Sequence, residues 1–484
     1  MTALPREIIE LDIDQLDWSN TEEIKSLMQK LLNLIAELAE SNAKLQEENR
    51  QLRGEGADTS SSNNDSKSLD SKERRKRREK SKKWRKSSKK GKVKIDRTEI
   101  CRVDKSILPP DAKFLGYRTV VKQNIIVKTD NVKYKLEQFY SESEDRFYEA
   151  DLPPNAPKGE FGPDFEALAM SLNHIGRMPH DKIHDFLSDI GALISKGQIT
   201  NILNKTKQDE FSKEREDIYK AGMNGSEVVH TDSTGMKHKG ESHHIHVLCN
   251  KMFSYFSIEK HKDRDTVRKL LRIPEGVLRY LILVADDAKQ YLQLCVLLSL
   301  CWLHEIRHYE RLKPVLQIHK KAVEEKIDRI WKYYFALREY KEWACKKPPP
   351  PLEEILKRQQ ELEKQFDKIF TASTGYYTLD HRISLTAAKK ERLLVPLYHP
   401  HVPLHNNDAE RPLREPVIRR KISGGTKSED GKKAWENMLT IKDTCRKHDV
   451  SFYHYLCDII SGRREMTLLS TLIRLGVNQI PVTY

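Results

Sequence analysis

The sequence predicts a mixed α/β core that carries a long helical insertion and follows an N-terminal coiled coil, a basic linker and a two-helix segment. Three observations lead to this prediction. Heptad spacing occupies residues 24–52, short β-rich runs cluster between residues 226 and 304, and helical periodicity takes over from about residue 305. A chain of 484 residues exceeds one ordinary core, so we expect about three or four folded units.

The composition is typical of packed domains combined with polar tracts. Hydrophobic residues make up 38% of the chain and charged residues 33%. No stretch approaches the roughly 18 uncharged apolar residues of a membrane span, and the start lacks the pattern of a signal peptide, so we expect a cytoplasmic protein without membrane contact. The seven cysteines are scattered and form no CxxC pair, which favours reduced thiols over a disulfide framework or a zinc ribbon.

The N-terminal segment, residues 1–54, predicts a leucine-zipper coiled coil. One seam repeats every seven residues at Ile24, Leu31, Leu38, Leu45 and Leu52, which is the period of a coiled-coil heptad. The adjacent seam includes asparagines, which favour a parallel two-stranded register. We therefore expect a homodimer or a higher oligomer. An amphipathic helix packed within its own chain is the alternative.

Residues 55–94 predict a disordered polar and basic linker. Between Lys72 and Lys94, fifteen Lys or Arg face two Glu, so +13 of the net charge of +14 falls in this tract. Such a tract can displace counterions from DNA phosphates and supply salt-sensitive affinity for any DNA sequence; a solvating tail is the alternative. Its candidate DNA-binding residues are Lys72, Arg74, Arg75, Lys76, Arg77, Arg78, Lys82, Lys83, Arg85 and Lys86.

Two smaller segments follow the linker. Residues 95–160 contain alternating stretches such as YRTVVKQNIIVKT, which predict a small strand-rich module. Residues 161–215 predict a helix-turn-helix DNA-binding segment, because DKIHDFLSDIGALISKGQITNIL gives two short helices broken at Gly191. Ser195 is expected to cap the second helix, and Ser195, Lys196 and Gln198 are candidate DNA contacts. Helical hairpins with a glycine turn also occur in proteins that never bind DNA.

Residues 220–305 predict the first part of a core sheet. EVVHTDST, HHIHVLCN and MFSYFSIEK predict strands, DTVRKLL predicts a helix, and LRYLILVADDAKQYLQLCVLL predicts a buried strand followed by a helix. Three strands, a helix and a further strand follow the order of a ribonuclease H-like α/β core. Asp232 lies in one strand and Asp286 ends another, so adjacent strands could bring their carboxylates together.

Residues 306–400 predict a helical insertion of long charged helices separated by prolines, and residues 401–465 complete the core with two further helices. The first of these two holds Glu410, and residues 466–484 are expected to form a C-terminal tail. Phosphodiester cleavage by two Mg²⁺ ions needs converging carboxylates such as these. As structural alternatives, Asp232 caps a turn and Asp286 is a helix N-cap.

Four blocks in this order, VHTDST, LVADDAKQY, CWLHEIRHYERL and HNNDAERPLREPVIRRK, resemble the signature blocks of transposases of the insertion sequence 66 family. The resemblance runs from about residue 24 to about residue 462. It implies a DDE-type transposase with a ribonuclease H-like core, bound to transposon terminal inverted repeats and target DNA. It further implies a nucleoid-associated bacterial protein that works with small element-encoded accessory proteins.

The resemblance also implies a metal centre by position. Asp232 matches the first catalytic aspartate, Asp286 the second, and Glu410 the glutamate of the family's last block. These three would hold two Mg²⁺ ions, for which Mn²⁺ can substitute. Asp287 competes with Asp286 for the middle position.

The Cys-Trp-x-His block of the family falls on Cys301, Trp302 and His304, with Arg307 one helical turn after His304. The resemblance implies that His304 and Arg307 contact DNA or the scissile phosphate. Cys301 and Trp302 are more typical of core positions. Cys301 and His304 alone fall short of the four ligands of a structural zinc site.

Around Glu410, Arg411 and Arg414 are candidate DNA contacts. Arg414 shares a helical face with Glu410, so it could orient that carboxylate or clamp a phosphate, although a surface salt bridge would show the same spacing.

The chain departs from the family pattern at His405, where members tend to have Asp, and keeps only Cys101 where many members carry a paired-cysteine zinc module. We expect no zinc near Cys101.

A different class of function is compatible with part of the chain. A non-enzymatic regulator with a zipper and a helix-turn-helix would explain residues 24–205 and leave the later carboxylates without a role. A catalytically inactive transposase relative is a further alternative. Loss of DNA cleavage on replacement of Asp232 separates an enzyme from both.

Overall fold

The computed structural model describes residues 95–477 except 105, 107, 110, 113, 155, 158 and 372, together with residues 22, 25, 26, 28–31, 33, 34, 37 and 41. The chain divides into two units, residues 1–42 with 130–484, and residues 43–129. The described residues between 22 and 41 are helical. Most of the predicted heptads and the whole basic tract of residues 72–94 lie outside the described residues, so both stay predictions.

The described part of residues 95–160 contains one antiparallel hairpin, formed by β1 (Gln138–Ser141) and β2 (Arg146–Glu149), and no further strand. The alternating stretch at residues 117–129 forms no strand, and Ile125 and Ile126 are 83% and 82% exposed. Alternation alone does not make a strand, because a strand is stabilised by a partner strand and by a surface on which its apolar face can pack.

Between the β1–β2 hairpin and the central sheet, the described residues form four helices: α4 (Pro163–His174), α5 (His180–Asp189), α6 (Lys196–Asn204) and α7 (Gln208–Asn224). Helices α5 and α6 are the two short helices expected from the sequence. Gly191 between them has a φ of +87°, a conformation that glycine adopts without a steric penalty. Ser195 caps α6 in a reciprocal capping box with Gln198. The predicted break and cap are confirmed, whereas DNA binding by this segment stays a prediction.

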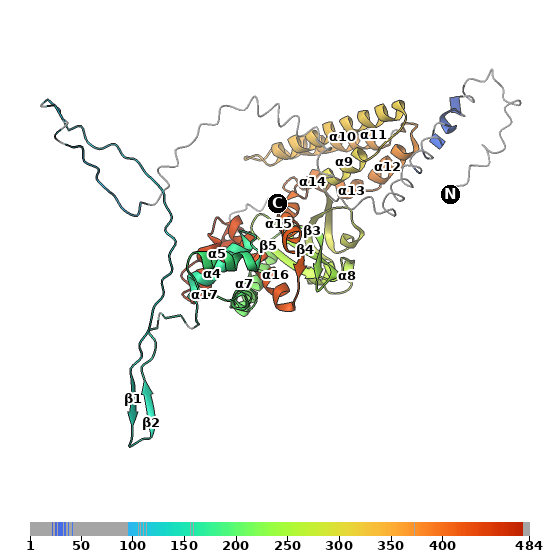
Figure 1. The fold of residues 1–484 in the computed structure, drawn as a ribbon. Coiled ribbons are helices and arrows are strands. Elements are labelled where there is room, and N and C mark those ends of the chain that lie inside the picture. The colour runs from blue at the N-terminus through green and yellow to red at the C-terminus, as the bar shows by residue number, and fades with distance from the viewer. Residues whose placement is uncertain are drawn as a thin grey trace. The chain divides into compact units, whose positions relative to one another are not determined.

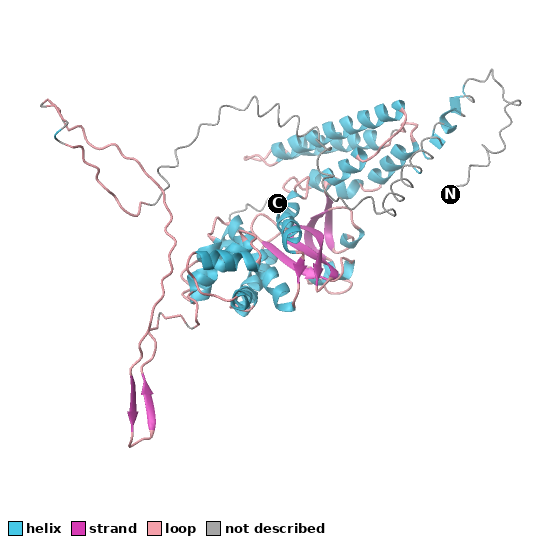
Figure 2. Cartoon of the chain, viewed as in Figure 1, coloured by secondary structure: helices cyan, strands magenta, loops and turns pink. Residues whose placement is uncertain are grey.

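A six-stranded mixed sheet forms the centre of the core (Figure 2). Its strands are β3 (Val228–His238), β4 (Glu241–Cys249), β5 (Ser254–Glu259), β6 (Arg279–Ala285), β7 (Cys295–Leu300) and β8 (Gly425–Thr426). They lie in the order β5-β4-β3-β6-β7, and β8 pairs with the far end of β3. Strand β3 is antiparallel to β4 and parallel to β6, and β6 is parallel to β7. A helix, α8 (Arg264–Leu270), precedes β6.

The prediction of a helix after β6 is wrong for residues 295–300, which form β7. Only a short 3-10 turn, η4 (Lys289–Tyr291), lies between the two strands. Periodicity cannot distinguish a short apolar run in a strand from one in a buried helix. Here the run CVLLSL pairs with β6, with Leu298 opposite Leu283, so tertiary pairing decides the outcome.

The remaining helices are α9 (Trp302–Glu310), α10 (Gln317–Ala344), α11 (Leu352–Phe370), α12 (Tyr377–Ala387), α13 (Lys390–Leu393), α14 (Val395–Tyr398), α15 (Asn407–Ser423), α16 (Glu429–Lys447), α17 (Phe452–Ser461) and α18 (Leu469–Val477). The long helices α10 and α11 are those expected in the helical insertion, and they pack together (Figure 1). Among the described residues, no helix is both long enough and apolar enough to cross a membrane.

Residues 466–484, expected to form a C-terminal tail, include α18. Leu469 and Ile473 on this helix are fully buried, and α18 packs against α7. Their four-residue spacing places both side chains on one helical face. The end of the described chain therefore belongs to the core.

Helices cover both faces of the sheet because its side chains alternate between the two. Ile245 and Val247 of β4 pack in one hydrophobic cluster with Ala409 and Leu413 of α15. On the opposite face, Leu248 joins a larger cluster with helices α4 to α7 and α16 to α18.

Helix α7 approaches the sheet most closely at Gly222. A side chain there would overlap the ring of Phe253, which is fully buried. Only a residue without a Cβ fits this crossing, so the close packing of α7 on the sheet depends on this glycine.

Candidate active site

Strand register places Asp232 and Asp286 next to each other on one face of the sheet. Strands β3 and β6 are parallel, and the last registered pair is His230 with Val284. Each aspartate lies two residues further along its strand direction. Neighbouring strands are about 4.8 Å apart, and a shift of two residues keeps a side chain on the same face. The pairing of β3 with β6 therefore places Asp232 and Asp286 next to each other, as the sequence predicts.

The charges of the three predicted carboxylates act on one another. Burial raises the pKa of Asp232 from its usual 3.8 to about 7, and the negative charges of Asp286 and Glu410 add to this rise. The backbone N–H of Ser233, which donates to Asp232 Oδ1 at 2.7 Å, opposes it. The structure thus brings Asp232, Asp286 and Glu410 together although they are far apart in the sequence.

Glu410 reaches this place because α15 begins against β3. Asn406, which is fully buried, precedes the helix and donates its side-chain N–H to the Thr231 carbonyl at 2.8 Å. Its side-chain oxygen accepts a hydrogen bond of 3.0 Å from His230 Nδ1. These bonds tie the start of α15 to the strand that holds Asp232. Asn406 occupies the N-cap position of α15, but its side chain makes no capping bond and serves this cross-link instead.

Two basic side chains of α9 approach Glu410. Its Oε1 lies 3.7 Å from His304 Nε2 and 3.7 Å from Arg307 Nη1. Burial lowers the pKa of His304, and the charges of Glu410 and Asp286 act in the opposite direction. Among the described residues, the basic side chains within 4.0 Å of Glu410 are these two, so Arg414, which is exposed, is not the residue that orients its carboxylate. Arg411 is exposed as well.

Asp287 interacts with a separate group of basic side chains. It forms an ion pair with Lys389 and another of 3.5 Å with Arg392. Lys389 is nearly buried and also lies 3.4 Å from a carboxylate oxygen of Glu305 on α9. Asp286, in contrast, accepts a backbone hydrogen bond from Ala288 at 3.2 Å. The two adjacent aspartates therefore have different surroundings, and only Asp286 acts on Asp232.

Tyr291 is a neighbour of the carboxylates that sequence reasoning missed. It is 1% exposed, and burial raises its pKa, with the charges of Asp286 and Asp232 adding to the rise. Tyr291 is therefore a buried neighbour of both aspartates. Only its position five residues after Asp286 could have drawn attention to it.

The carboxylates are suited to divalent cations. Asp232, Asp286 and Glu410 supply the hard oxygen ligands that Mg²⁺ and Mn²⁺ prefer. Glu410 Oε1 is buried and has no hydrogen-bond partner among the described residues, and a buried polar atom in this state needs compensation. A second set of possible metal ligands, which includes sulfur and imidazole, also lies here: the ligand atoms of Cys301, His304 and Glu410 are within 4.8 Å of one another.

The candidate DNA contacts of the two-helix segment lie elsewhere. Ser195 and Gln198 are partly occupied by the capping box, and Gln198 Nε2 also donates to Glu160 at 2.6 Å. Lys196 is exposed and pairs with Asp181 at 2.8 Å.

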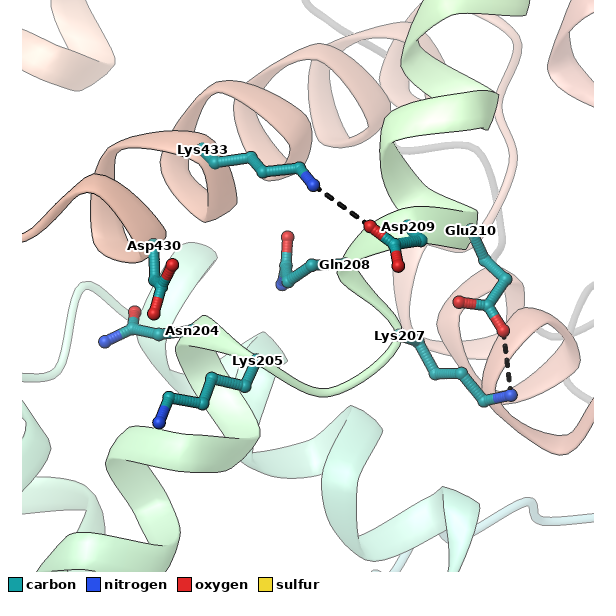
Figure 3. Close-up of a pocket in the computed structure, with 8 residues that line it drawn as sticks. All are labelled: Asn204, Lys205, Lys207, Gln208, Asp209, Glu210, Asp430 and Lys433. Atoms are coloured by element: carbon teal, nitrogen blue, oxygen red, sulfur yellow. Dashed lines mark hydrogen bonds and ion pairs between the residues drawn. The ribbon is translucent and has the colours of Figure 1, made fainter.

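The junction of α6 and α7 with α16 forms a cleft of about 300 Å³ (Figure 3). In it Lys433 pairs with Asp209 and Lys207 with Glu210, each through a contact within 3.1 Å. Its cationic side chains are therefore matched by acidic neighbours, and this cleft offers little net charge to a phosphate.

A second cleft, of about 590 Å³, has a more basic lining. Lys196 of α6 and His180 of α5 face it from one side, and Arg419 and Lys427 face it from the C-terminal part of α15 and the loop that follows. Arg419 stacks over Trp435 with 5.3 Å between guanidinium and ring centre, and burial lowers its pKa to about 10. This cleft joins the two-helix segment to the helix that carries Glu410.

Comparison with known proteins agrees with this arrangement. The family model described as "Transposase IS66 family" matches residues 158–434, more than half of the chain. The chain belongs to this family. The matched residues include β3, β6, α9 and α15, so they cover every carboxylate of the site and the helix that carries His304.

A relative in Sinorhizobium fredii (strain NBRC 101917 / NGR234), named "Uncharacterized protein y4jO", is 38% identical over 203 residues. The aligned part covers 40% of this IS66-family chain and 60% of that relative. The chain thus spans less than two thirds of the length of that relative, whose name states no activity.

Proposed function

We propose that the chain is a DNA transposase with a ribonuclease H-like core, in which Asp232, Asp286 and Glu410 form a DDE-type metal centre. The strand order β5-β4-β3-β6-β7 and membership of the transposase family support this assignment. One observation carries it. The parallel register of β3 and β6 sets Asp232 beside Asp286, and burial, with the charges of Asp286 and Glu410 adding to it, raises the pKa of Asp232 to about 7, as expected for acids gathered to share divalent cations.

In this proposal the three carboxylates hold two Mg²⁺ ions, or Mn²⁺ in their place, which activate a water molecule and stabilise the leaving oxygen when bound. Asp286 is preferred over Asp287 because Asp287 is already paired with Lys389 and Arg392. Tyr291, buried beside Asp286 and Asp232, keeps bulk water from the inner side of the site.

The reaction proceeds in two phosphoryl transfers. In the first, the oxygen of water bonds to phosphorus as the bond to the DNA 3′-oxygen breaks, and a proton from water passes by way of solvent to that 3′-oxygen. The released 3′-hydroxyl then attacks a phosphodiester of the target, which frees a target 3′-oxygen. Bonds are exchanged one for one, so no nucleotide cofactor is needed. Arg307 and His304, both near Glu410, orient that carboxylate and face the scissile phosphate.

DNA is held outside the metal centre in this proposal. The basic tract of residues 72–94 supplies general affinity, and the α5–α6 segment and the basic cleft around Arg419 hold the backbone of a transposon end. The coiled coil would pair two chains so that two ends meet, and small accessory proteins encoded by the same element would assist. We also propose a cytoplasmic, nucleoid-associated location.

The test uses purified full-length protein and DNA from either side of its reading frame. Asp232→Asn, Asp286→Asn and Glu410→Gln should each abolish Mg²⁺-dependent cleavage while DNA binding persists. The Asp287→Asn variant is the matched control, because its side chain points away from the carboxylate group. It should keep cleavage wherever it stays folded. Inverted repeats that border the reading frame, with a short duplicated host sequence outside them, would identify the ends.

The outcome decides between the proposed enzyme and its rivals. A non-enzymatic regulator or an inactive relative would bind DNA and leave it intact in all variants and in the wild type. Cleavage that survives in Asp232→Asn would refute the proposed metal centre.

A further inference from the structure

A cysteine, a histidine and the last carboxylate of the site converge at the start of α9. The ligand atoms of Cys301, His304 and Glu410 lie within 4.8 Å of one another, and His304 Nε2 is 3.7 Å from Glu410 Oε1. Cys301 is the N-cap position of α9 and His304 lies three residues later, so both side chains sit on one side of the helix start.

Several backbone N–H groups lie close to the sulfur of Cys301. The backbone N–H of Asn406 donates to Cys301 Sγ at 3.2 Å. Backbone N–H groups of His304 and Leu303 also favour the thiolate, although burial raises the pKa of the thiol overall. Trp302, fully buried, donates its indole N–H to the Leu393 carbonyl at 2.9 Å. The position of the thiol is therefore fixed before any ligand arrives.

The other two side chains have unsatisfied atoms. His304 Nδ1 and Glu410 Oε1 are buried and have no hydrogen-bond partner among the residues that the structure describes. Buried polar atoms without partners are rare in folded proteins, and a bound ion can satisfy them. The unpartnered oxygen of Glu410, the imidazole of His304 and the thiol of Cys301 converge on one place, which indicates a ligand with positive charge.

We propose that Cys301, His304 and Glu410 form a site for Zn²⁺, and that zinc bound there withdraws Glu410 from the Mg²⁺ centre. Sulfur and imidazole ligands select Zn²⁺ over Mg²⁺, which prefers oxygen. Three protein ligands with an open fourth position are a common zinc geometry. Binding exchanges the thiol proton of Cys301, released to solvent, for a zinc–sulfur bond, and adds one bond to the imidazole and one to the carboxylate.

Glu410 connects the zinc site to the metal centre. Its charge also acts on Asp232, so one carboxylate is shared by both ligand sets. Arg307 lies beside the same oxygen, but its side chain is 43% exposed and can turn into solvent when a cation binds. Zinc is therefore an inhibitor that competes with Mg²⁺ for Glu410. The inhibition rests on the proposed function, whereas zinc binding itself does not.

Binding is tested on metal-stripped full-length protein without DNA, by titration with Co²⁺ as a spectroscopic substitute for zinc. One equivalent should give a thiolate-to-cobalt charge-transfer band in the wild type. The Cys301→Ser variant should lose this band, and Cys345→Ser, which removes an exposed thiol, should keep it. If circular dichroism shows that Cys301→Ser is misfolded, His304→Ala should lose the cobalt ligation in its place. A band that survives both changes, or no band in the wild type, overturns the site.

Inhibition is tested by adding Zn²⁺ to Mg²⁺-dependent DNA cleavage, with each variant compared with its own zinc-free rate. The Cys301→Ser variant should need at least about tenfold more zinc for half inhibition, because loss of a ligand costs at least as much as loss of a supporting group. Equal sensitivity in wild type and variant refutes the competition. If the wild type cleaves nothing while the cobalt band depends on Cys301, the proposed function fails and the zinc site stands.

Discussion

Replacing Asp232 by Asn should stabilise the metal-free protein at alkaline pH. The folded state raises the pKa of Asp232 from 3.8 to about 7, mainly by burial and then by the charges of Asp286 and Glu410. Between these two pH values the folded protein keeps a proton that the unfolded chain has lost, so stability falls as pH rises and the full loss is reached above pH 7. A change of one in pKa corresponds to about 1.36 kcal/mol, which gives about 4 kcal/mol in total.

Asn cannot ionise and so avoids this loss. Most of the difference, about 3 kcal/mol, falls between pH 5 and pH 8, because the Asp232 carboxyl of the folded protein becomes fully charged only above pH 7. Urea unfolding in a chelator, at pH 5 and pH 8, measures the gap in the free energy of unfolding between variant and wild type. From pH 5 to pH 8, we expect the free energy of unfolding of the variant, relative to that of the wild type, to rise by up to about 3 kcal/mol.

The matched control is Asp287→Asn. Asp287 is paired with Lys389 and Arg392, so its loss should destabilise the protein at pH 8. Added Mg²⁺ should stabilise the wild type more than Asp232→Asn, since only the wild type has the complete ligand set. A gap between Asp232→Asn and wild type that is the same at both pH values would show that Asp232 is not held among the other carboxylates in the way described.

Three further substitutions test the packing that supports the site, each by urea unfolding. Lys389→Met should cost up to about 3 kcal/mol because it removes one cation from the buried Glu305 and from Asp287, which keep Arg382 and Arg392 as partners. Lys390→Met, whose partners are more exposed, should cost less than about 1 kcal/mol; equal losses would contradict this. Gly222→Ala should lower the free energy of unfolding by at least about 1–3 kcal/mol, because the new methyl group would overlap the ring of Phe253. Gly197→Ala, a position inside a helix with ordinary contacts, is the control and should be neutral or stabilising. Asn406→Ala should cost about 2 kcal/mol by leaving buried groups unpaired, and an unchanged stability would refute its role as a cross-link.

Part of the site could be predicted because local sequence carries the information. Asp232 sits within a β-rich run and Asp286 directly follows an apolar one, and an acidic residue in such a place needs compensation from its surroundings. Once β3 and β6 pair in parallel, the two residues are level by register. Their approach therefore follows from strand pattern and sheet topology alone.

Other parts depend on contacts between distant segments and left no local signal. The distinction between Asp286 and Asp287 requires Lys389, about a hundred residues later in the chain. The role of Asn406 requires knowledge that β3 lies beside it. The run that forms β7 is apolar enough for a helix or a strand, and only its partner β6 decides. In residues 117–129, polar and apolar side chains alternate as in a strand, but these residues form no strand because they have no partner strand.

Ion pairs of one lysine link the turn after β6 to the helical insertion. Lys389, at the start of α13, holds Asp287 and also Glu305 on α9, while Asp286 occupies the adjacent position in that turn. Any force that tilts α13 is therefore transmitted through one ammonium group to the backbone beneath a proposed metal ligand. The insertion therefore supports the turn that holds a proposed metal ligand, even though it supplies no carboxylate to the proposed site.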